Sequence, residues 1–107
     1  MMKKQTAGHQ QLGDLAPQFA ALNDDVLFGE VWAKTDELSA RDRSLITCAA
    51  LMAQGLFPQL KAHLKMAQAN GVTQTEIVAL VTQLAFYTGW PKAWSAFDLV
   101  KQTYGQA

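Results

Sequence analysis

Residues 70–77 read Asn-Gly-Val-Thr-Gln-Thr-Glu-Ile, and this stretch marks the boundary between two helices. Its Asn-Gly pair suits the left-handed backbone conformation that commonly ends a helix. Thr73 and Glu76 then form a capping box, in which each side chain accepts a hydrogen bond from the backbone N–H of the other residue. Val72 and Ile77 occupy the two positions of the accompanying hydrophobic staple. We therefore predict that one helix ends just before this stretch and that another begins within it.

Similar start and stop signals divide the rest of the chain. Gly55 ends an apolar helix, and Pro58 suits the first turn of the next one. Gly89-Trp90-Pro91 pairs a helix stop with a new start, and the run Asn23-Asp24-Asp25 favours a helix start through side-chain capping. Apolar spacing predicts helices over the approximate ranges 17–22, 24–33, 40–54, 58–69, 74–88 and 90–104. No segment alternates long enough to predict a strand, so we expect an all-α fold, a compact bundle of about five to six helices.

The helix before Gly55 is apolar on nearly every side. Between Leu45 and Ala53 the only polar side chain is that of Thr47. A helix that is apolar all round is normally buried all round. We expect this one to be either the central helix of the bundle or part of a contact between subunits.

The chain is long enough for one domain with one core. Residues 1–14 lack hydrophobic periodicity, and we predict that they form a flexible N-terminal tail or an arm. Residues 15–107 are predicted to form the single helical domain.

The composition indicates a protein that covers some of its surface with another copy. Half of the residues are apolar and 17% are charged, against roughly 25% in an average soluble domain. A homo-oligomer would cover the excess apolar surface, although a surface rich in polar backbone is the alternative. Nine basic and nine acidic side chains cancel, so nucleic acid and anionic membranes are not expected partners.

The sequence also predicts a location inside the cell. The uncharged stretch Leu45–Leu60 contains several polar residues and is shorter than a membrane span of about 20 residues. The first ten residues have lysines but no apolar stretch of an export signal, so we expect a cytoplasmic protein. Cys48 is the only cysteine, which leaves no disulfide within the chain and no cysteine cluster for a metal; no metal is expected.

Two titratable side chains are candidates for proton transfer. His63 lies inside a predicted helix between apolar residues, and a half-buried imidazole can exchange protons near neutral pH. A structural histidine held by one hydrogen bond would give the same pattern. Glu30 is the only acid in the interior of Val26–Trp32 and is a candidate proton donor or acceptor, or else a surface glutamate at the rim of an apolar face.

Three further side chains are candidates for substrate binding. Arg43 lies near the start of a helix, where the helix dipole does not stabilise a cation. We therefore expect its guanidinium to have another role. It either binds a carboxylate of a substrate or forms an ion pair with Glu30 or with Asp36 and Glu37. Ser44 beside it is a candidate hydrogen-bond donor, although serine in a first turn is common without function. Trp94 belongs to a set of aromatic residues that either line a pocket or form core and subunit contacts. Cys48 lies in an apolar run and is expected to be an inert core residue.

Five blocks of the sequence together resemble the carboxymuconolactone decarboxylase family. They keep the family's order and spacing from about Phe19 to Tyr104, and as an ordered set they are fairly specific. The blocks are Phe28–Trp32, Arg41–Thr47, His63, Asn70–Thr73 and Gly89–Ala93.

The resemblance implies an all-helical fold that assembles as a trimer or hexamer. The namesake enzyme of the family removes carbon dioxide from 4-carboxymuconolactone during aromatic catabolism, without metal or organic cofactor. Carried over by position, the resemblance implies that Arg43 engages a carboxylate while His63 and Glu30 manage the proton that replaces carbon dioxide. The leading hypothesis is thus a cofactor-free lyase acting on a small unsaturated carboxylic acid or lactone. A non-catalytic oligomeric protein that binds small molecules is the alternative.

A sister branch of the same superfamily, the alkylhydroperoxidase D type, reduces peroxides with a Cys-x-x-Cys-x-x-x-His motif and an upstream glutamate. Aligned on His63, the two cysteine positions are occupied by Leu56 and Gln59, and the glutamate position by Ser44. A disulfide cycle needs two neighbouring thiols. Thiol peroxidase activity is therefore the least supported of the three hypotheses.

Overall fold

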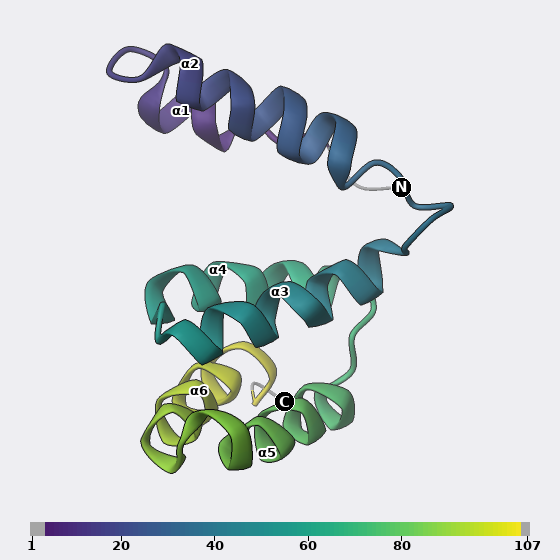
Figure 1. The fold of residues 1–107 in the computed structure, drawn as a ribbon, viewed down its shortest axis with the longest axis vertical. Coiled ribbons are helices and arrows are strands. Elements are labelled where there is room, and N and C mark those ends of the chain that lie inside the picture. The colour runs from purple at the N-terminus through teal and green to yellow at the C-terminus, as the bar shows by residue number, and fades with distance from the viewer. Residues whose placement is uncertain (1–3, 106–107) are drawn as a thin grey trace. The chain divides into compact units, whose positions relative to one another are not determined.

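The structure, a computed structural model that describes residues 4–105, contains helices and no strands within that range (Figure 1). The predicted all-α fold is thereby confirmed. The chain divides into two compact units, residues 1–40 and residues 41–107.

The first unit contains three helical segments. These are α1 (Ala7–Leu12), α2 (Pro17–Ala21) and the π-helix η1 (Leu22–Val31). As expected, Pro17 lies in the first turn of α2. The helix start predicted at residues 23–25 is wrong, because α2 passes into η1 without a break.

Asp24 does not begin a helix because its carboxylate caps α1 instead. The backbone N–H groups of Gly8 and His9 each donate to Asp24 at 2.9 Å, and the imidazole Nδ1 of His9 also contacts this carboxylate. Asn23 donates a further hydrogen bond at 2.8 Å. Thr6, the residue before α1, makes no capping hydrogen bond with its side chain. A carboxylate contributed from 16 residues further along the chain thus accepts from two of the free N–H groups of this short helix, and the side chain of Gln5 accepts from a third, that of Ala7.

The carboxylate of Asp24 is buried, which by itself would raise its pKa. The hydrogen bonds from Asn23, His9 and Gly8 outweigh burial and hold the pKa of Asp24 well below its usual range. Gly8 makes this approach possible, because a Cβ at that position would lie 2.7 Å from a carboxylate oxygen of Asp24.

Residues 1–14, predicted as a flexible tail or an arm, include α1. Residues 1–3 lie outside the described part of the chain. No local pattern predicts α1, because the carboxylate that accepts from its Gly8 and His9 N–H groups is distant in sequence. The assignment of residues 15–107 to a single domain stays a prediction.

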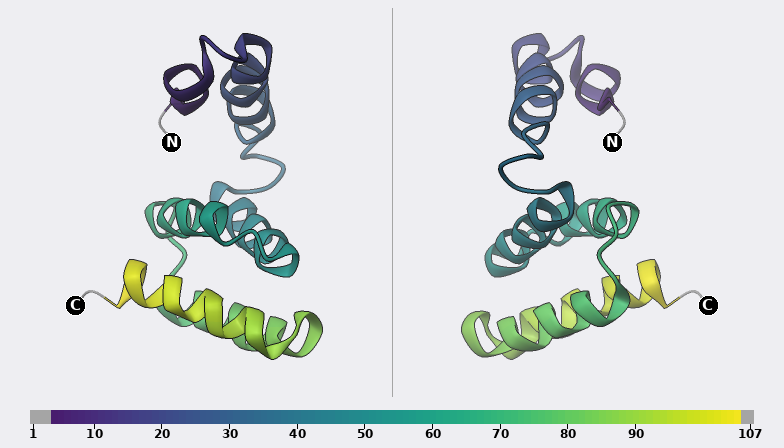
Figure 2. Two further views of the ribbon diagram at one scale, coloured as in Figure 1. Left: turned by 90° about the vertical axis from the view of Figure 1, so that its left-hand side faces the viewer. Right: turned by 90° about the vertical axis from the view of Figure 1, so that its right-hand side faces the viewer.

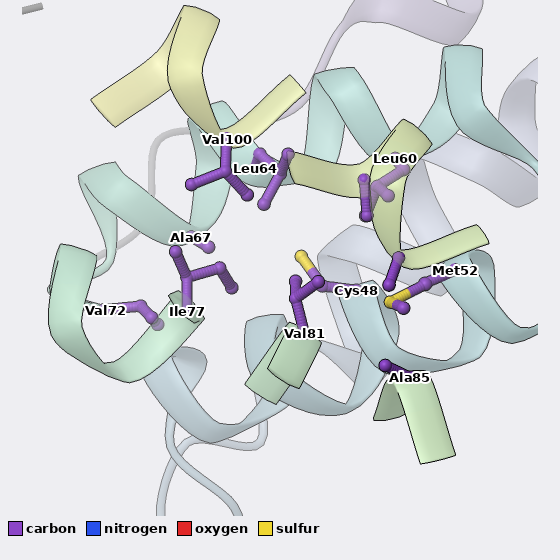
Figure 3. Packing of buried hydrophobic residues seen from close by; sticks show 12 residues of the cluster. Cys48, Met52, Leu60, Leu64, Ala67, Val72, Ile77, Val81, Ala85 and Val100 are labelled. Carbon is purple, nitrogen blue, oxygen red and sulfur yellow. The ribbon is translucent and has the colours of Figure 1, made fainter. Parts of the chain in front are cut away.

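The second unit consists of four helices in two layers. These are α3 (Ala40–Gln54), α4 (Phe57–Ala69), α5 (Gln74–Thr88) and α6 (Trp90–Tyr104). The views in Figures 1 and 2 agree that α3 and α4 form one layer and that α5 and α6 form the other. All four helices contribute to one apolar core (Figure 3), which includes Cys48, Met52, Leu60, Leu64, Ile77, Val81, Ala96 and Val100.

The helix boundaries of this unit follow the sequence signals. The capping box is confirmed: the Thr73 hydroxyl accepts from the Glu76 N–H at 3.1 Å, and the Glu76 carboxylate accepts from the Thr73 N–H at 2.9 Å. Gly55, Gly71 and Gly89 all have positive φ, as their positions at helix ends require. After Gly71, the backbone N–H of Val72 donates to the carbonyl of Ala67, which completes a Schellman motif.

The expectation that α3 is the central, fully buried helix of the bundle is wrong, and its alternative, a contact between subunits, stays a prediction. Ser44, Cys48 and Met52, spaced four residues apart, form its buried stripe. Ile46 is 58% exposed. Since a four-helix unit in two layers offers each helix only two neighbours, an apolar helix in it keeps one face uncovered.

Candidate functional site

The start of α3 lies against the end of α4. The side-chain amide of Asn70 donates to the Ser44 hydroxyl oxygen at 3.0 Å. Ser44 is completely buried, so this hydrogen bond joins the two helices where water cannot compete. The bond defines one end of the seam between α3 and α4. The predicted contact of Ser44 with a substrate stays a prediction, and its oxygen already has this structural partner.

His63 lies on the same seam. It precedes Asn70 by seven residues, which is nearly two helical turns, so the two side chains project from the same side of α4. The axial separation is about 10 Å, from the rise of the α-helix. His63 is half-buried, and its Nδ1 atom is shielded from solvent. Burial lowers the pKa of His63 below its ordinary value of 6.5, so the imidazole is neutral at pH 7.

The two arginines at the start of α3 have different surroundings. Arg41 forms ion pairs with Asp42 at 2.8 Å and with Glu76 of α5. Arg43 is half-buried and directly precedes Ser44 in the first turns of α3. The hydroxyl of Thr47 donates to the carbonyl of Arg43 at 2.7 Å and ties these two turns of α3 together. Arg43 on α3 and His63 on α4 thus belong to the same unit, on two helices that the Asn70–Ser44 bond joins.

The contact between Arg41 and Glu76 was missed by sequence reasoning. The capping box already accounted for the presence of glutamate at position 76. No feature of the sequence indicated that Arg41, 35 residues away, also contacts its carboxylate. Together the two side chains border a groove between α3 and α5 of about 430 Å³, which is otherwise mostly apolar.

Trp94 lies in a different part of the second unit. It lines a hollow of about 500 Å³ between α5 and α6, together with Trp90, Phe97 and Lys101. The ammonium of Lys92 donates to the carbonyl of Ala53 at 2.9 Å, which places the start of α6 at the far end of α3. From Ser44 to Ala53, α3 rises about 14 Å. Within one chain the structure therefore does not bring Trp94 together with Arg43 and Ser44, and its predicted role in substrate binding stays a prediction.

Glu30 is an exposed residue of η1 and belongs to the first unit. Arg43 and His63 belong to the second. That Glu30 shares a site with them stays a prediction.

Cys48 has the properties of a core residue. Its side chain is 1% exposed, and burial raises the pKa of its thiol to about 12. Because the thiolate is the reactive form, this cysteine is protonated and unreactive at neutral pH. The expectation of an inert Cys48 is confirmed in this respect.

Residues 4–105 contain neither a cluster of metal-ligating side chains nor a helix that could cross a membrane. Within this range, no three side chains of His, Cys, Asp or Glu gather in a way that would hold a metal ion. No helix in the same range has the length and apolar character needed to cross a bilayer.

Comparison with known proteins gives one family and several relatives. The sequence profile of the Carboxymuconolactone decarboxylase family matches residues 17–102. A 4-carboxymuconolactone decarboxylase of Acinetobacter baylyi is 30% identical over 95 residues, which are 89% of this chain and 70% of that protein. An uncharacterised 15.0 kDa protein of Paracoccus denitrificans is 29% identical over 94 residues, covering 86% of this chain and 69% of its own length.

A further relative is named after a different substrate. The nitrosuccinic acid decarboxylase of Metarhizium robertsii is 33% identical over 76 residues, which are 71% of this chain and 52% of that protein. The two relatives with named activities are thus both decarboxylases, and their substrates differ.

Proposed function

Because the chain belongs to the carboxymuconolactone decarboxylase family, we propose that it is a cofactor-free lyase that releases carbon dioxide from a small unsaturated carboxylic acid or lactone. The observation that supports the proposal is that a half-buried, neutral His63 on α4 and a half-buried Arg43 on α3 belong to the same unit, in which the Asn70–Ser44 bond joins the two helices. A neutral imidazole can accept and pass on a proton, and a guanidinium can bind a carboxylate.

Arg43 binds a carboxylate of the substrate. A guanidinium makes two parallel hydrogen bonds to a carboxylate, which fixes both the position and the orientation of the ligand. The resemblance to the family assigns this role by position to Arg43, whereas Arg41 forms ion pairs with Asp42 and Glu76. We therefore assign substrate binding to Arg43 and a structural contact to Arg41.

His63 handles the proton. When the carbon–carbon bond to the departing carboxylate breaks, its electron pair stays on the substrate carbon and is accepted by the adjoining unsaturated system. Carbon dioxide leaves, and a proton takes its place on that carbon. The neutral imidazole of His63 first takes up a proton from water or from a neighbouring acid, and the imidazolium so formed delivers it to this carbon and becomes neutral again. Glu30 is proposed as the second group in this proton exchange.

The test uses the two acids that occur in the relatives' names as probes. Carbon dioxide release from 4-carboxymuconolactone and from nitrosuccinate is measured with wild type, His63→Gln and Arg43→Gln, and the panel is then widened to other lactones and oxo-acids. We expect His63→Gln to lower kcat by about 10²- to 10⁴-fold, the usual contribution of a general acid or base. Arg43→Gln should act mainly by raising KM, because it removes a charge-assisted contact to the bound acid.

Two matched variants serve as controls. His9→Gln removes the other histidine, which lies in the first unit, and Arg41→Gln removes the neighbouring arginine of α3. Both should retain turnover. Unchanged turnover in His63→Gln would remove His63 from the mechanism, and a larger rise of KM in Arg41→Gln than in Arg43→Gln would reverse their roles. Thermal stabilisation by a probe without release of carbon dioxide would support the non-catalytic binding protein instead.

A further inference from the structure

The pair Asn70-Gly71 is a place where the chain can modify itself. Asparagine is one of the thermolabile residues of proteins. The backbone nitrogen of the next residue can attack the side-chain carbonyl carbon Cγ and close a five-membered succinimide ring. A side chain on that next residue hinders the attack, and glycine has no Cβ to do so. The other asparagine of the chain, Asn23, is followed by Asp24, so position 70 is the more reactive of the two.

The modification needs water and no other reactant. The Gly71 nitrogen loses its proton as it bonds to Cγ of Asn70, and the side-chain nitrogen of Asn70 leaves as ammonia. Water then opens the ring. Cleavage of the new bond gives aspartate, whereas cleavage of the original peptide bond gives isoaspartate, in which the main chain gains a methylene group. Both products carry a new negative charge.

The backbone of the folded chain holds the two reacting atoms apart. Asn70 follows the last turn of α4 with φ −87° and ψ 6°. A ψ near zero makes the Gly71 nitrogen eclipse the Asn70 nitrogen about the Cα–C bond, whereas a nearly planar ring requires it to eclipse Cβ. The Gly71 N–H, whose proton must leave, also donates to the carbonyl of Gln68 at 3.2 Å. Gly71 is held at φ 94° within the Schellman motif that Val72 completes.

The side chain of Asn70 is held by the neighbouring helix α3. Its amide nitrogen, the atom that must leave, donates to the Ser44 hydroxyl at 3.0 Å. Because Ser44 is completely buried, turning the amide toward Gly71 would break a hydrogen bond that water does not replace. We call the Ser44–Asn70 bond and the last turn of α4 together the α3–α4 junction. Both parts of this junction oppose closure of the ring.

We propose that Asn70 is a deamidation site gated by the α3–α4 junction. Ring closure proceeds from a locally opened state, in which the last turn of α4 unwinds and the Ser44 contact is broken. Deamidation is irreversible, and both products lose the amide that donates to Ser44. Both also place a negative charge at the C-terminus of α4, where the helix dipole disfavours it. Each opening of the junction thus carries a chance of permanent damage. The proposal is independent of the reaction proposed above.

Peptide mapping by mass spectrometry tests the gate on the full chain, incubated at mildly alkaline pH. Asn70 of folded wild type should deamidate much more slowly than Asn70 of the chain unfolded in urea. Ser44→Ala should raise the rate in the folded protein by about 2- to 10-fold, the factor by which loss of one hydrogen bond increases the open population. The matched control is Val81→Ala, which trims a buried core residue in the middle of α5. It should lower Tm and leave the rate at Asn70 unchanged.

Two further measurements keep the test independent of any single variant. Asn23 is an internal reference, because its rate should not change in Ser44→Ala. In wild type, the slowing of deamidation on folding should match the hydrogen-exchange protection of the Val72 N–H, which donates to Ala67 within the same turn. This second comparison needs no substitution and replaces Ser44→Ala if circular dichroism shows that the variant does not fold.

Three results would overturn the proposal. Deamidation of folded wild type at the rate of the urea-unfolded chain shows that the junction gives no protection. No greater acceleration by Ser44→Ala than by Val81→Ala shows that the Ser44 contact does not gate the reaction. An Asn70 that stays unmodified even in urea shows that this position is not a deamidation site.

Discussion

The two units of this chain are held together in different ways. The second unit has an apolar core to which four helices contribute, and polar contacts such as the Asn70–Ser44 bond lie at its edges. The first unit has a short helix, α1, whose backbone is anchored to the carboxylate of Asp24. Apolar burial is distributed over many contacts, whereas the anchoring of α1 is concentrated in one side chain. Single substitutions should therefore have graded effects in the second unit and all-or-none local effects in the first.

Removal of a core side chain should have the largest effect on global stability. Leu64 is buried in the centre of the second unit, and Leu64→Ala should lower the free energy of unfolding by about 2–5 kcal/mol, through lost burial and the cavity left behind. Urea titration followed by tryptophan fluorescence measures the change. Leu15→Ala makes the same chemical change at a residue that is 84% exposed and should cost far less. Equal costs at the two positions would contradict a core centred on Leu64.

Asp24→Asn should release α1 without unfolding the second unit. An amide at this position loses the carboxylate charge and keeps one oxygen to accept from the N–H groups of Gly8 and His9. We expect hydrogen exchange to show lost protection in α1 and unchanged protection in α5. The neighbouring variant Asp25→Asn is the control, since Asp25 is exposed. Loss of protection throughout the chain would show that the two units unfold together.

Ser44→Ala should have a moderate effect. The substitution removes the hydroxyl that accepts from the half-buried amide of Asn70, and a hydrogen bond of this kind contributes about 0.5–1.5 kcal/mol. Thermal unfolding should therefore show a lower Tm. Ser44→Ala with Asn70→Ala should recover part of the loss, because both polar groups are then removed. No recovery in the double variant would indicate that the two residues act independently.

The smallest expected effect is the pH dependence contributed by His63. Burial lowers the pKa of His63 in the folded protein, while the unfolded chain binds a proton near the ordinary value of 6.5. The unfolded state therefore holds more protons just below pH 6.5, so stability falls as the pH decreases through that region. His63→Gln should flatten this part of the stability profile. Asp24 acts in a separate window, since its lowered pKa makes it stabilising above its usual value of 3.8 and less so as acid is added.

Local signals in the sequence predicted the second unit well. Gly55, Gly89 and the Thr73–Glu76 capping box each specify a helix end within a few residues, and all three lie where expected. The first unit was harder because its organising contact joins Gly8 to Asp24, far apart in sequence, and because α-helical and π-helical turns share the same residue preferences. The candidate site was predicted in part. The helical position of His63 follows from local spacing, but the distance of Trp94 from Ser44 depends on which ends of two helices meet.

The close approach of Gly8 to Asp24 constrains which residues homologues can have at these two positions. A methyl group at position 8 would occupy the space of the carboxylate oxygen, and without the carboxylate the N–H groups of Gly8 and His9 lose their acceptor. The same methyl group would lie 2.9 Å from the backbone carbonyl of Ala20, so the space at position 8 stays closed even where the acid is lost. We therefore expect homologues that keep an acid at position 24 to keep glycine at position 8, and ancestral reconstruction should show no branch on which the glycine is lost while the acid is kept.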